Sequence, residues 1–280
     1  MKLKAYAKIN LSLDVKGKRK DGYHELDMIM VPIDLYDLVN IELATEDRFT
    51  CNVEGLAMDN SNTVVKAVTL MREVYHLDQK FHIHVEKNIP AQAGLAGGSS
   101  DGAAVMRGIQ ELCKLDIPIE ELAMLSKQVG ADVPFCVMAK SAVVQGIGEY
   151  ITPFDVHCDF DILLVKPPMG VSTQQAFSML DFSKCAHPSS MAVRKCLEED
   201  RFEELAHCMG NSLEYSAFQL VSDIVKIKTE LSEAGFEVVL MSGSGSTVFA
   251  LTRDQALLNT QAEKMKAKGY FVAKTKIVKG

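Results

Sequence analysis

The clearest pattern in the chain is an alternation of apolar and polar residues over positions 3–15. Odd positions from Leu3 to Val15 are apolar, and even positions from Lys4 to Asp14 are mostly polar. Because successive side chains of a strand point to opposite faces, this period predicts one long strand, or two strands joined by a bulge. Lys8 and Asn10 then point the same way. A solvated polar face is the plain alternative to a functional one.

The rest of the first half reads as strands and helices in a mixed order. The basic run at 16–22 predicts a solvated hairpin tip. Strands are expected at 23–35, 37–45, 49–55 and 81–90, with a helix at 62–77. A helix follows Gly94–Ala104 and fades near Leu115, another ends at Gly130, and residues 141–154 read as strand, turn and strand edge.

The second half follows a different pattern, in the order β-α-β-β-α-β. A buried strand at 160–168 precedes helical stretches to about 234, strands at 236–242 and 246–252, a helix at 254–268 and a last strand at 270–278. This order is typical of the split βαβ arrangement of ferredoxin-like domains. We therefore predict an α+β fold with two domains, at 1–155 and 156–280.

Composition excludes several classes of protein. The 280 residues carry a net charge of −7, which disfavours nucleic-acid binding. The alternating N-terminus does not predict a signal peptide, and no apolar run reaches the length of a membrane span. Seven cysteines without a C-x-x-C pair predict reduced thiols in the cytoplasm, and no protein metal site. His82 and His84 share one strand face, where packing or exposure is favoured over metal binding.

The segment "GLAGGSSDGAA" at 94–104 leads from glycines into a helical pattern, with Ser99, Ser100 and Asp101 as N-cap candidates. Backbone N–H groups at a helix N-terminus form a ready anion site. Neither of the two best-known phosphate signatures is present. Because the Asp101 carboxylate would repel a phosphate, a complex of Mg²⁺ with a nucleotide is the preferred ligand. A flexible connector is the plain alternative.

Two further segments contain small or acidic residues at turns. "MSGSGSTVFA" at 241–250 lies between two apolar strands, and its small residues favour either a hairpin turn or close approach to a ligand. In "VGADVPFCV", Asp132 follows the helix stop at Gly130 and precedes Pro134. Asp132 is either an N-cap or a carboxylate at the edge of a site.

Together these segments resemble the GHMP kinases, the family of galactokinase, homoserine kinase and mevalonate kinase. The family's phosphate loop, P-x-x-x-G-L-x-G/S-S-S, is similar to "PAQAGLAGGSS" at 90–100, and its C-terminal glycine motif is similar to "SGSGST". The resemblance implies an S5-like N-terminal domain followed by a ferredoxin-like domain. "AKINLSLDV", "DGYHEL", "GIGEYITPF" and "KPPMGVSTQQAF" resemble the branch that phosphorylates a cytidine diphosphate sugar alcohol for isoprenoid synthesis.

This resemblance assigns the chemistry to two residues. Lys8 matches the family's catalytic lysine and Asp132 its catalytic aspartate. Lys8 would polarise the substrate hydroxyl and stabilise the Asp132 carboxylate, which would accept the proton late or only orient the hydroxyl. Asn10 would hold the polyol or the diphosphate.

The same resemblance assigns the binding residues. Tyr23 and Phe177 would enclose the cytosine, and His24 would read its edge. The ATP phosphates would lie on the glycine loop, formed by Pro90, Gly94, Leu95, Ala96, Gly97, Gly98, Ser99 and Ser100, with Asn62 and Lys87 near the adenosine. The second motif contributes Gly243, Ser244 and Gly245. The implied ligands are ATP, Mg²⁺ and the small-molecule acceptor, bound by a monomer or homodimer.

The chain departs from the family pattern as follows: Tyr6 for Pro, Gly102 for Ala, Ile147 for Arg, Ser212 for Asp and Ser246 for Pro. Lys8 and Asp132 are unaffected. Because several departures lie near the substrate and glycine loops, a kinase for another acceptor and a non-catalytic binding relative remain as alternatives.

Overall fold

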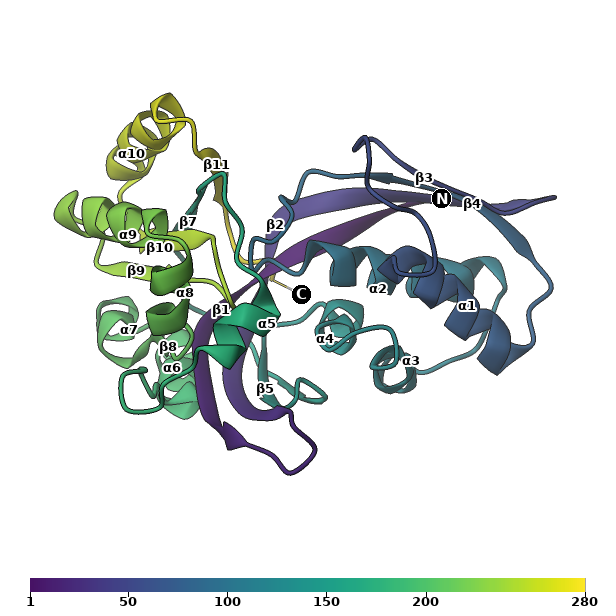
Figure 1. Ribbon diagram of the computed structural model, residues 1–280, viewed down its shortest axis with the longest axis horizontal. Helices are drawn as coiled ribbons and strands as arrows, with labels where there is room; N and C mark the ends of the chain where they lie inside the picture. The colour runs from purple at the N-terminus through teal and green to yellow at the C-terminus, as the bar shows by residue number, and fades with distance from the viewer. Residues whose placement is uncertain (280) are drawn as a thin grey trace. The chain divides into compact units, whose positions relative to one another are not determined.

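The computed structural model describes residues 1–279, whose helices and strands alternate along the chain (Figure 1). They form two compact units that interleave in sequence. Unit 1 comprises Met1–Ala7, Leu35–Ile89 and Ala96–Ala139, and unit 2 comprises Lys8–Asp34, Pro90–Leu95 and Lys140–Gly280. The α+β class is confirmed, whereas the division at residue 155 stays a prediction.

Two long strands run from one unit into the other. Strand β1 (Lys2–Lys18) confirms the period-two prediction, and β2 (His24–Ala44) is continuous where two strands were expected. The basic run forms the hairpin tip between them, closed by a hydrogen bond from Arg19 N to Tyr23 O of 2.7 Å. Each strand therefore contributes residues to both units.

Unit 1 places helices against a sheet. Strand β4 (Lys80–Glu86) pairs antiparallel with β2 and parallel with β3 (Arg48–Cys51). Phe81, Ile83 and Val85 of β4 are buried, as its alternation requires. Helices α1 (Thr63–Tyr75) and α2 (Gly97–Leu112) pack on each other, and α4 (Val133–Met138) packs on α2 and on α3 (Ile119–Ser126).

Unit 2 contains a four-stranded antiparallel sheet in the order β11-β7-β10-β9. Its strands are β7 (Asp161–Lys166), β9 (Val238–Met241), β10 (Val248–Thr252) and β11 (Phe271–Thr275). Helices α9 (Asp223–Glu233) and α10 (Gln255–Ala267) pack against this sheet. The chain order β7-α9-β9-β10-α10-β11 confirms the split βαβ prediction.

The remaining elements of unit 2 are short. They are the strands β5 (Ala142–Gly146), β6 (Tyr150–Pro153) and β8 (Gly210–Asn211), and the helices α5 (Thr173–Ser178), α6 (Ser190–Glu198), α7 (Phe202–Cys208) and α8 (Glu214–Leu220). Strand β5 pairs with the beginning of β2, and β8 pairs parallel with β1. Among residues 1–279, no helix has the length and apolar character needed to cross a membrane.

Candidate active site

The polar face of β1 is buried from Lys8 to Asp14, which excludes the solvated-face alternative for that part of the strand. Lys8 is 4% exposed and Asn10 is 1% exposed. Lys8 Nζ donates a 2.6 Å hydrogen bond to Asn10 Oδ1, and Asn10 N donates to Ser242 Oγ at 3.3 Å. Burying an ammonium group costs free energy unless polar groups surround it. The hydrogen bond from Lys8 to Asn10 therefore offsets part of the cost of burying Lys8.

The second glycine motif lies directly on this lysine–asparagine pair. A Cβ built on Gly243 would lie 3.2 Å from Lys8 Nζ and 3.4 Å from Asn10 Oδ1. The motif is also the turn between β9 and β10, closed by a 2.9 Å bond from Ser242 N to Thr247 O. The hairpin interpretation is therefore correct and the turn packs against Lys8, whereas close approach to a ligand stays a prediction.

The first half of the glycine loop, Pro90–Leu95, binds the second motif through its backbone. Ser242 Oγ donates to Gly94 O at 3.0 Å, and Thr247 N donates to Ala93 O at 3.2 Å. Gly94 has φ +72°, and a Cβ there would lie 2.0 Å from Ser242 O. Only glycine fits this position. Leu95 O accepts from Lys8 N at 3.1 Å, so the loop also holds the backbone of the lysine.

The second half of the loop starts helix α2 in unit 1. Ala96 is the N-cap residue, with φ +58°, and the first helical bond joins Ser100 N to Ala96 O at 2.9 Å. The N-cap candidates Ser99, Ser100 and Asp101 were wrong, because the helix begins at Gly97. Ser100 Oγ instead donates to Tyr6 O at 2.6 Å. The amides of Gly97, Gly98 and Ser99 lie in the first turn, where helix N–H groups bind anions.

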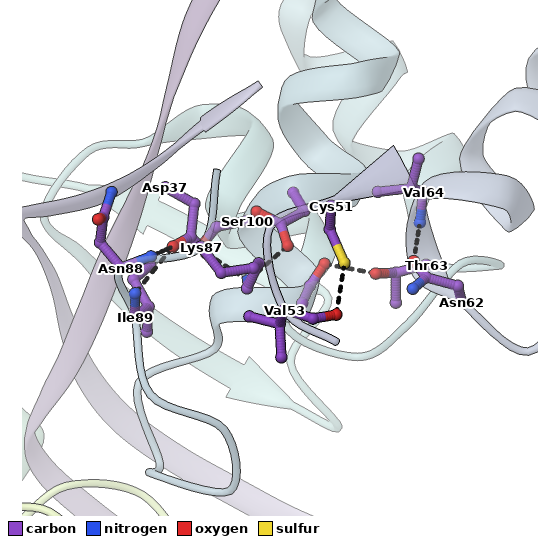
Figure 2. A network of polar contacts seen from close by, with 12 residues as sticks. Asp37, Cys51, Val53, Asn62, Thr63, Val64, Lys87, Asn88, Ile89 and Ser100 are labelled. Atoms are coloured by element: carbon purple, nitrogen blue, oxygen red, sulfur yellow. Dashed lines mark hydrogen bonds and ion pairs between the residues drawn. The ribbon is translucent and has the colours of Figure 1, made fainter. Parts of the chain in front are cut away.

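A buried ionic cluster lies beside this helix start (Figure 2). Lys87 Nζ donates to Asp101 Oδ2 at 2.6 Å and also forms a short contact with Asp37 Oδ2. Asp37 is fully buried, and its other oxygen accepts from the backbone amides of Asn88 and Ile89. A Cβ on Gly97 would lie 3.4 Å from Lys87 Nζ. The cluster thus fixes the segment that leads into the loop.

Burial raises the pKa of Asp101 to about 7; Lys87 opposes this rise and Asp37 adds to it. The Lys87 ammonium thus places a positive charge directly against the Asp101 carboxyl group. One oxygen of Asp101, Oδ1, is buried and has no hydrogen-bond partner within residues 1–279. Within these residues, no group of three His, Cys, Asp or Glu side chains could hold a metal ion.

Asn62 and Thr63 stabilise the start of helix α1. Asn62 Oδ1 accepts from Val64 N at 2.9 Å, so Asn62 is the N-cap of α1. Thr63 Oγ1 donates to Gly98 O at 2.6 Å, within the glycine loop. The two helices that flank the loop are thus joined at their N-termini by Thr63.

Asp132 and Lys8 belong to different units. Asp132 occupies the N-cap position of α4 but makes no side-chain capping hydrogen bond there, and Val133 and Pro134 follow in the first turn. Lys8 belongs to the first residues of unit 2. Their action on one hydroxyl stays a prediction.

The three predicted cytidine residues belong to unit 2, where His24 and Phe177 are in contact. The rings of His24 and Phe177 stack, with centroids 4.9 Å apart and an interplanar angle of 26°. Tyr23 is 61% exposed at the hairpin tip. Burial, with the positive charge of Lys18, lowers the pKa of His24, so its ring is neutral near pH 7. The predicted enclosure of cytosine by Tyr23 and Phe177 remains untested.

The departures from the family pattern have local partners. Gly102 allows α2 to approach α1, because a Cβ there would lie 3.2 Å from Thr63 O. Ser246 Oγ donates to Met169 O at 2.6 Å, and Ser212 Oγ donates to Ala186 O at 2.7 Å. Tyr6 packs edge-on against Tyr36, and Ile147 N donates to Glu149. The side chains of Tyr6, Ser212 and Ser246 therefore make contacts of their own, whereas Ile147 is bonded here only through its backbone amide.

Asp37 is a site residue that the sequence interpretation missed. It occupies an odd position of β2 together with the buried residues Val39 and Ile41, so its carboxylate points to the core side of the strand. A charged residue at a core position was the available signal. Its partner Lys87 lies 50 residues away, which no local pattern reveals.

The chain is similar to known proteins over nearly its whole length. A family model described as "GHMP kinases N terminal domain" matches residues 62–140, and one described as "GHMP kinases C terminal" matches residues 193–270. A 4-diphosphocytidyl-2-C-methyl-D-erythritol kinase from Clostridium beijerinckii is 42% identical, and one from Clostridium botulinum (strain Eklund 17B) is 40% identical. Each match covers 98% of this chain and 100% of the relative.

Solved structures show the same similarity. A crystal structure of 4-(cytidine 5'-diphospho)-2C-methyl-D-erythritol kinase matches with a TM-score of 0.81 and 29% identity, covering 99% of both chains. A homoserine kinase from Cytophaga hutchinsonii matches with a TM-score of 0.75 and 16% identity, over 98% of this chain and 94% of that chain. The second match shows the fold alone.

Proposed function

Because the chain belongs to the GHMP kinase family, we propose that it transfers the γ-phosphoryl group of ATP to the 2-hydroxyl of 4-diphosphocytidyl-2-C-methyl-D-erythritol. The observation that carries the chemistry is the buried pair of Lys8 and Asn10, covered by the glycine turn at Gly243. Relatives of that name that match nearly the full length support the choice of acceptor.

The ATP phosphates bind to the glycine loop. The first-turn amides of Gly97, Gly98 and Ser99 and the positive end of α2 attract the phosphate oxygens. Because the pKa of Asp101 is raised, its side chain is only partly ionised near pH 7, and the Lys87 ammonium offsets the remaining negative charge. An anionic ligand on the loop is therefore repelled less. Pro90, Gly94, Leu95 and Ala96 set the path of the loop. Asn62 and Lys87 stay assigned to the adenosine side.

Phosphoryl transfer depends on positioning and on charge stabilisation more than on covalent chemistry by the protein. In this proposal, Lys8 stabilises the negative charge that develops on the transferred group and polarises the acceptor hydroxyl. Asp132 orients the hydroxyl and takes its proton late in the reaction. Asn10 fixes the Lys8 ammonium through their 2.6 Å hydrogen bond and contacts the acceptor's polyol.

Mg²⁺ accompanies ATP in this proposal. Magnesium sites in kinases use one or two carboxylates together with substrate phosphates, rather than a cage made by the protein. Asp101 Oδ1, which is buried without a hydrogen-bond partner among residues 1–279, is the carboxylate oxygen next to the loop that would face the ion. The ion supplies charge neutralisation on the phosphates when it is bound.

The cytidine moiety binds beside the stacked rings of His24 and Phe177, with Tyr23 able to cover the base from the hairpin tip. Ser244 and Gly245 extend the turn at Gly243 beside Thr173, whose hydroxyl lies 2.9 Å from Ser244 Oγ.

We place this reaction in the cytoplasm, catalysed by a monomer or homodimer that acts on small molecules and binds neither membranes nor nucleic acid.

The proposal is tested by ADP release with MgATP over a panel of acceptors. The panel contains 4-diphosphocytidyl-2-C-methylerythritol, methylerythritol phosphate without the cytidine, mevalonate, homoserine and galactose. We expect turnover with the first acceptor alone. Turnover with another acceptor would contradict the roles of Tyr23, His24 and Phe177. ATP binding without turnover of any acceptor would favour a non-catalytic relative.

A further inference from the structure

We propose that Asn211 is a positioning residue that holds the glycine turn against the catalytic lysine. This inference rests on the proposed function, because it assigns to Asn211 the alignment of Gly243 with Lys8. Asn211 belongs to the segment "NSLE" at 211–214, which contains the departure at Ser212 but none of the candidate site residues. Its side chain is 1% exposed.

All polar groups of the Asn211 side chain are used. Nδ2 donates to Met241 O and to Gly243 O, both at 2.8 Å, and Oδ1 accepts from Leu213 N at 2.9 Å. An amide offers two donors and an acceptor, which matches this set. A carboxylate at this position would place its oxygens against the two carbonyl oxygens, which would repel them. An apolar side chain would leave both carbonyl groups buried without a hydrogen-bond donor.

The carbonyls that Asn211 binds belong to the turn that packs on Lys8. Met241 ends β9, and Gly243 is the residue whose missing Cβ makes room for Lys8 Nζ and Asn10 Oδ1. The adjacent Ser242 is hydrogen-bonded to Asn10 N and to Gly94 O. A shift of the Gly243 carbonyl would therefore move the turn relative to the Lys8 ammonium.

The same segment is anchored to the strand that carries Lys8. Strand β8 pairs with β1 so that Leu13 lies opposite Asn211, and Ser212 N donates to Leu13 O at 2.8 Å. Val15 N donates to Ser212 Oγ at 3.0 Å. At the other end of the segment, Glu214 Oε1 accepts from Met241 N at 3.0 Å. The segment thus joins β1 to the glycine turn, and Asn211 makes the contact nearest to the lysine.

The test compares Asn211→Ala with Ser216→Ala as a matched control. Ser216 is also 1% exposed, and its hydroxyl donates only to Leu213 O, at 3.1 Å, among the partners identified in residues 1–279. We expect Asn211→Ala to lower kcat by about 10-fold to 100-fold, because small displacements of catalytic groups are that costly. Its KM for ATP should stay within about threefold of wild type, since the contacts that bind ATP in the ground state are retained. Ser216→Ala should retain kcat even where it lowers Tm.

A second arm tests whether Asn211 acts through Gly243. Gly243→Ala and the double variant Asn211→Ala/Gly243→Ala complete a double-mutant cycle. The loss of kcat in the double variant should be clearly smaller than the product of the losses in the two single variants. Should Asn211→Ala not fold, Asn211→Ser retains one donor and is expected to show a smaller loss of kcat. The inference would be overturned if a folded Asn211 variant had the same kcat as the wild type. It would also be overturned if Ser216→Ala lowered kcat by as much as the Asn211 variant does. Absence of turnover in the wild type would instead overturn the proposed function.

Discussion

The two glycine segments of this protein share a composition and differ in what occupies the space left by their missing side chains. At Gly97, in the Pro90–Ser100 loop, that space faces Ile89 and Lys87, which support the start of helix α2. At Gly243, in the second segment, it faces Lys8 and Asn10. The first segment thus packs on residues that support a helix start, and the second packs its backbone against Lys8.

In our proposal, this difference separates the residues that bind ATP from those that act in phosphoryl transfer. The buried cluster of Asp37, Lys87 and Asp101 belongs to unit 1 with the helix start, so changes there should act mainly on ATP affinity. Lys8, Asn10 and the turn at Gly243 belong to unit 2, so changes there should act mainly on turnover. Four predictions test the contrast.

Lys8→Ala should have the largest effect. We expect kcat to fall by about 10²–10³-fold, because a preorganised charge next to the reacting group is lost. The Kd for an ATP analogue should change by less than about twofold, since ground-state nucleotide binding does not need this ammonium. Steady-state kinetics and calorimetric titration measure the two quantities. Lys87→Met should show the opposite split, and equal losses of turnover and affinity in Lys8→Ala would contradict its role.

Gly94→Ala should destabilise the fold where the two glycine segments meet. The added Cβ would lie 2.0 Å from Ser242 O at a residue with φ +72°. We expect the free energy of unfolding to fall by at least about 1–3 kcal/mol, which is the typical cost of a strained backbone. Thermal unfolding measures the loss. Gly98→Ala is the control, since its Cβ would lie 3.5 Å from Thr63 Oγ1 and should leave Tm nearly unchanged. Equal Tm values for the two variants would argue against the packing described.

Phe177→Ala should weaken acceptor binding. Loss of one aromatic partner of a base is worth about 1–3 kcal/mol, so KM for the cytidine acceptor should rise by roughly tenfold. KM for ATP should not change. Tyr23→Ala is the companion variant, and its effect shows whether the exposed ring covers the base. A rise in KM for ATP in Phe177→Ala would show that the aromatic ring has been assigned to the wrong ligand.

The pH dependence of acceptor binding should give the smallest effect. Because burial and Lys18 lower the pKa of His24, the ring stays neutral at pH 7 and becomes protonated only below the ordinary value of 6.5. Neutral His24 reads the cytosine edge in our proposal, so KM for the acceptor should be flat from pH 8 to about 6.5 and rise below it. His24→Asn should remove this rise. A rise that begins above pH 7 would contradict the lowered pKa.

The sequence predicted the elements better than it predicted their partners. The period of two in β1 identified the strand, yet it could not show whether the polar side was buried, because burial of Lys8 and Asn10 depends on Ser242 and Gly243, more than 230 residues later. Local propensity placed the N-cap at Ser99–Asp101, whereas a left-handed Ala96 starts the helix earlier and Ser100 bonds to Tyr6.

The candidate site shows the same limit. The family resemblance placed Lys8, Asn10 and the glycine turn in one site, and these residues are in contact within unit 2. Asp37 and Asn211 were missed, because each acts through backbone groups distant in sequence: Asn88 and Ile89 for Asp37, and Met241 and Gly243 for Asn211. Interactions of that kind give only a weak signal in the sequence, such as a charged residue at a core position of β2.

Phosphorus NMR of the reaction mixture shows whether the γ-phosphoryl group of ATP is transferred to the cytidine acceptor. With wild-type protein, MgATP and 4-diphosphocytidyl-2-C-methylerythritol, we predict a new phosphomonoester signal that grows together with ADP, while the diphosphate signals of the acceptor stay intact. Formation of ADP with inorganic phosphate alone, or an unchanged acceptor with ATP bound, would contradict the account.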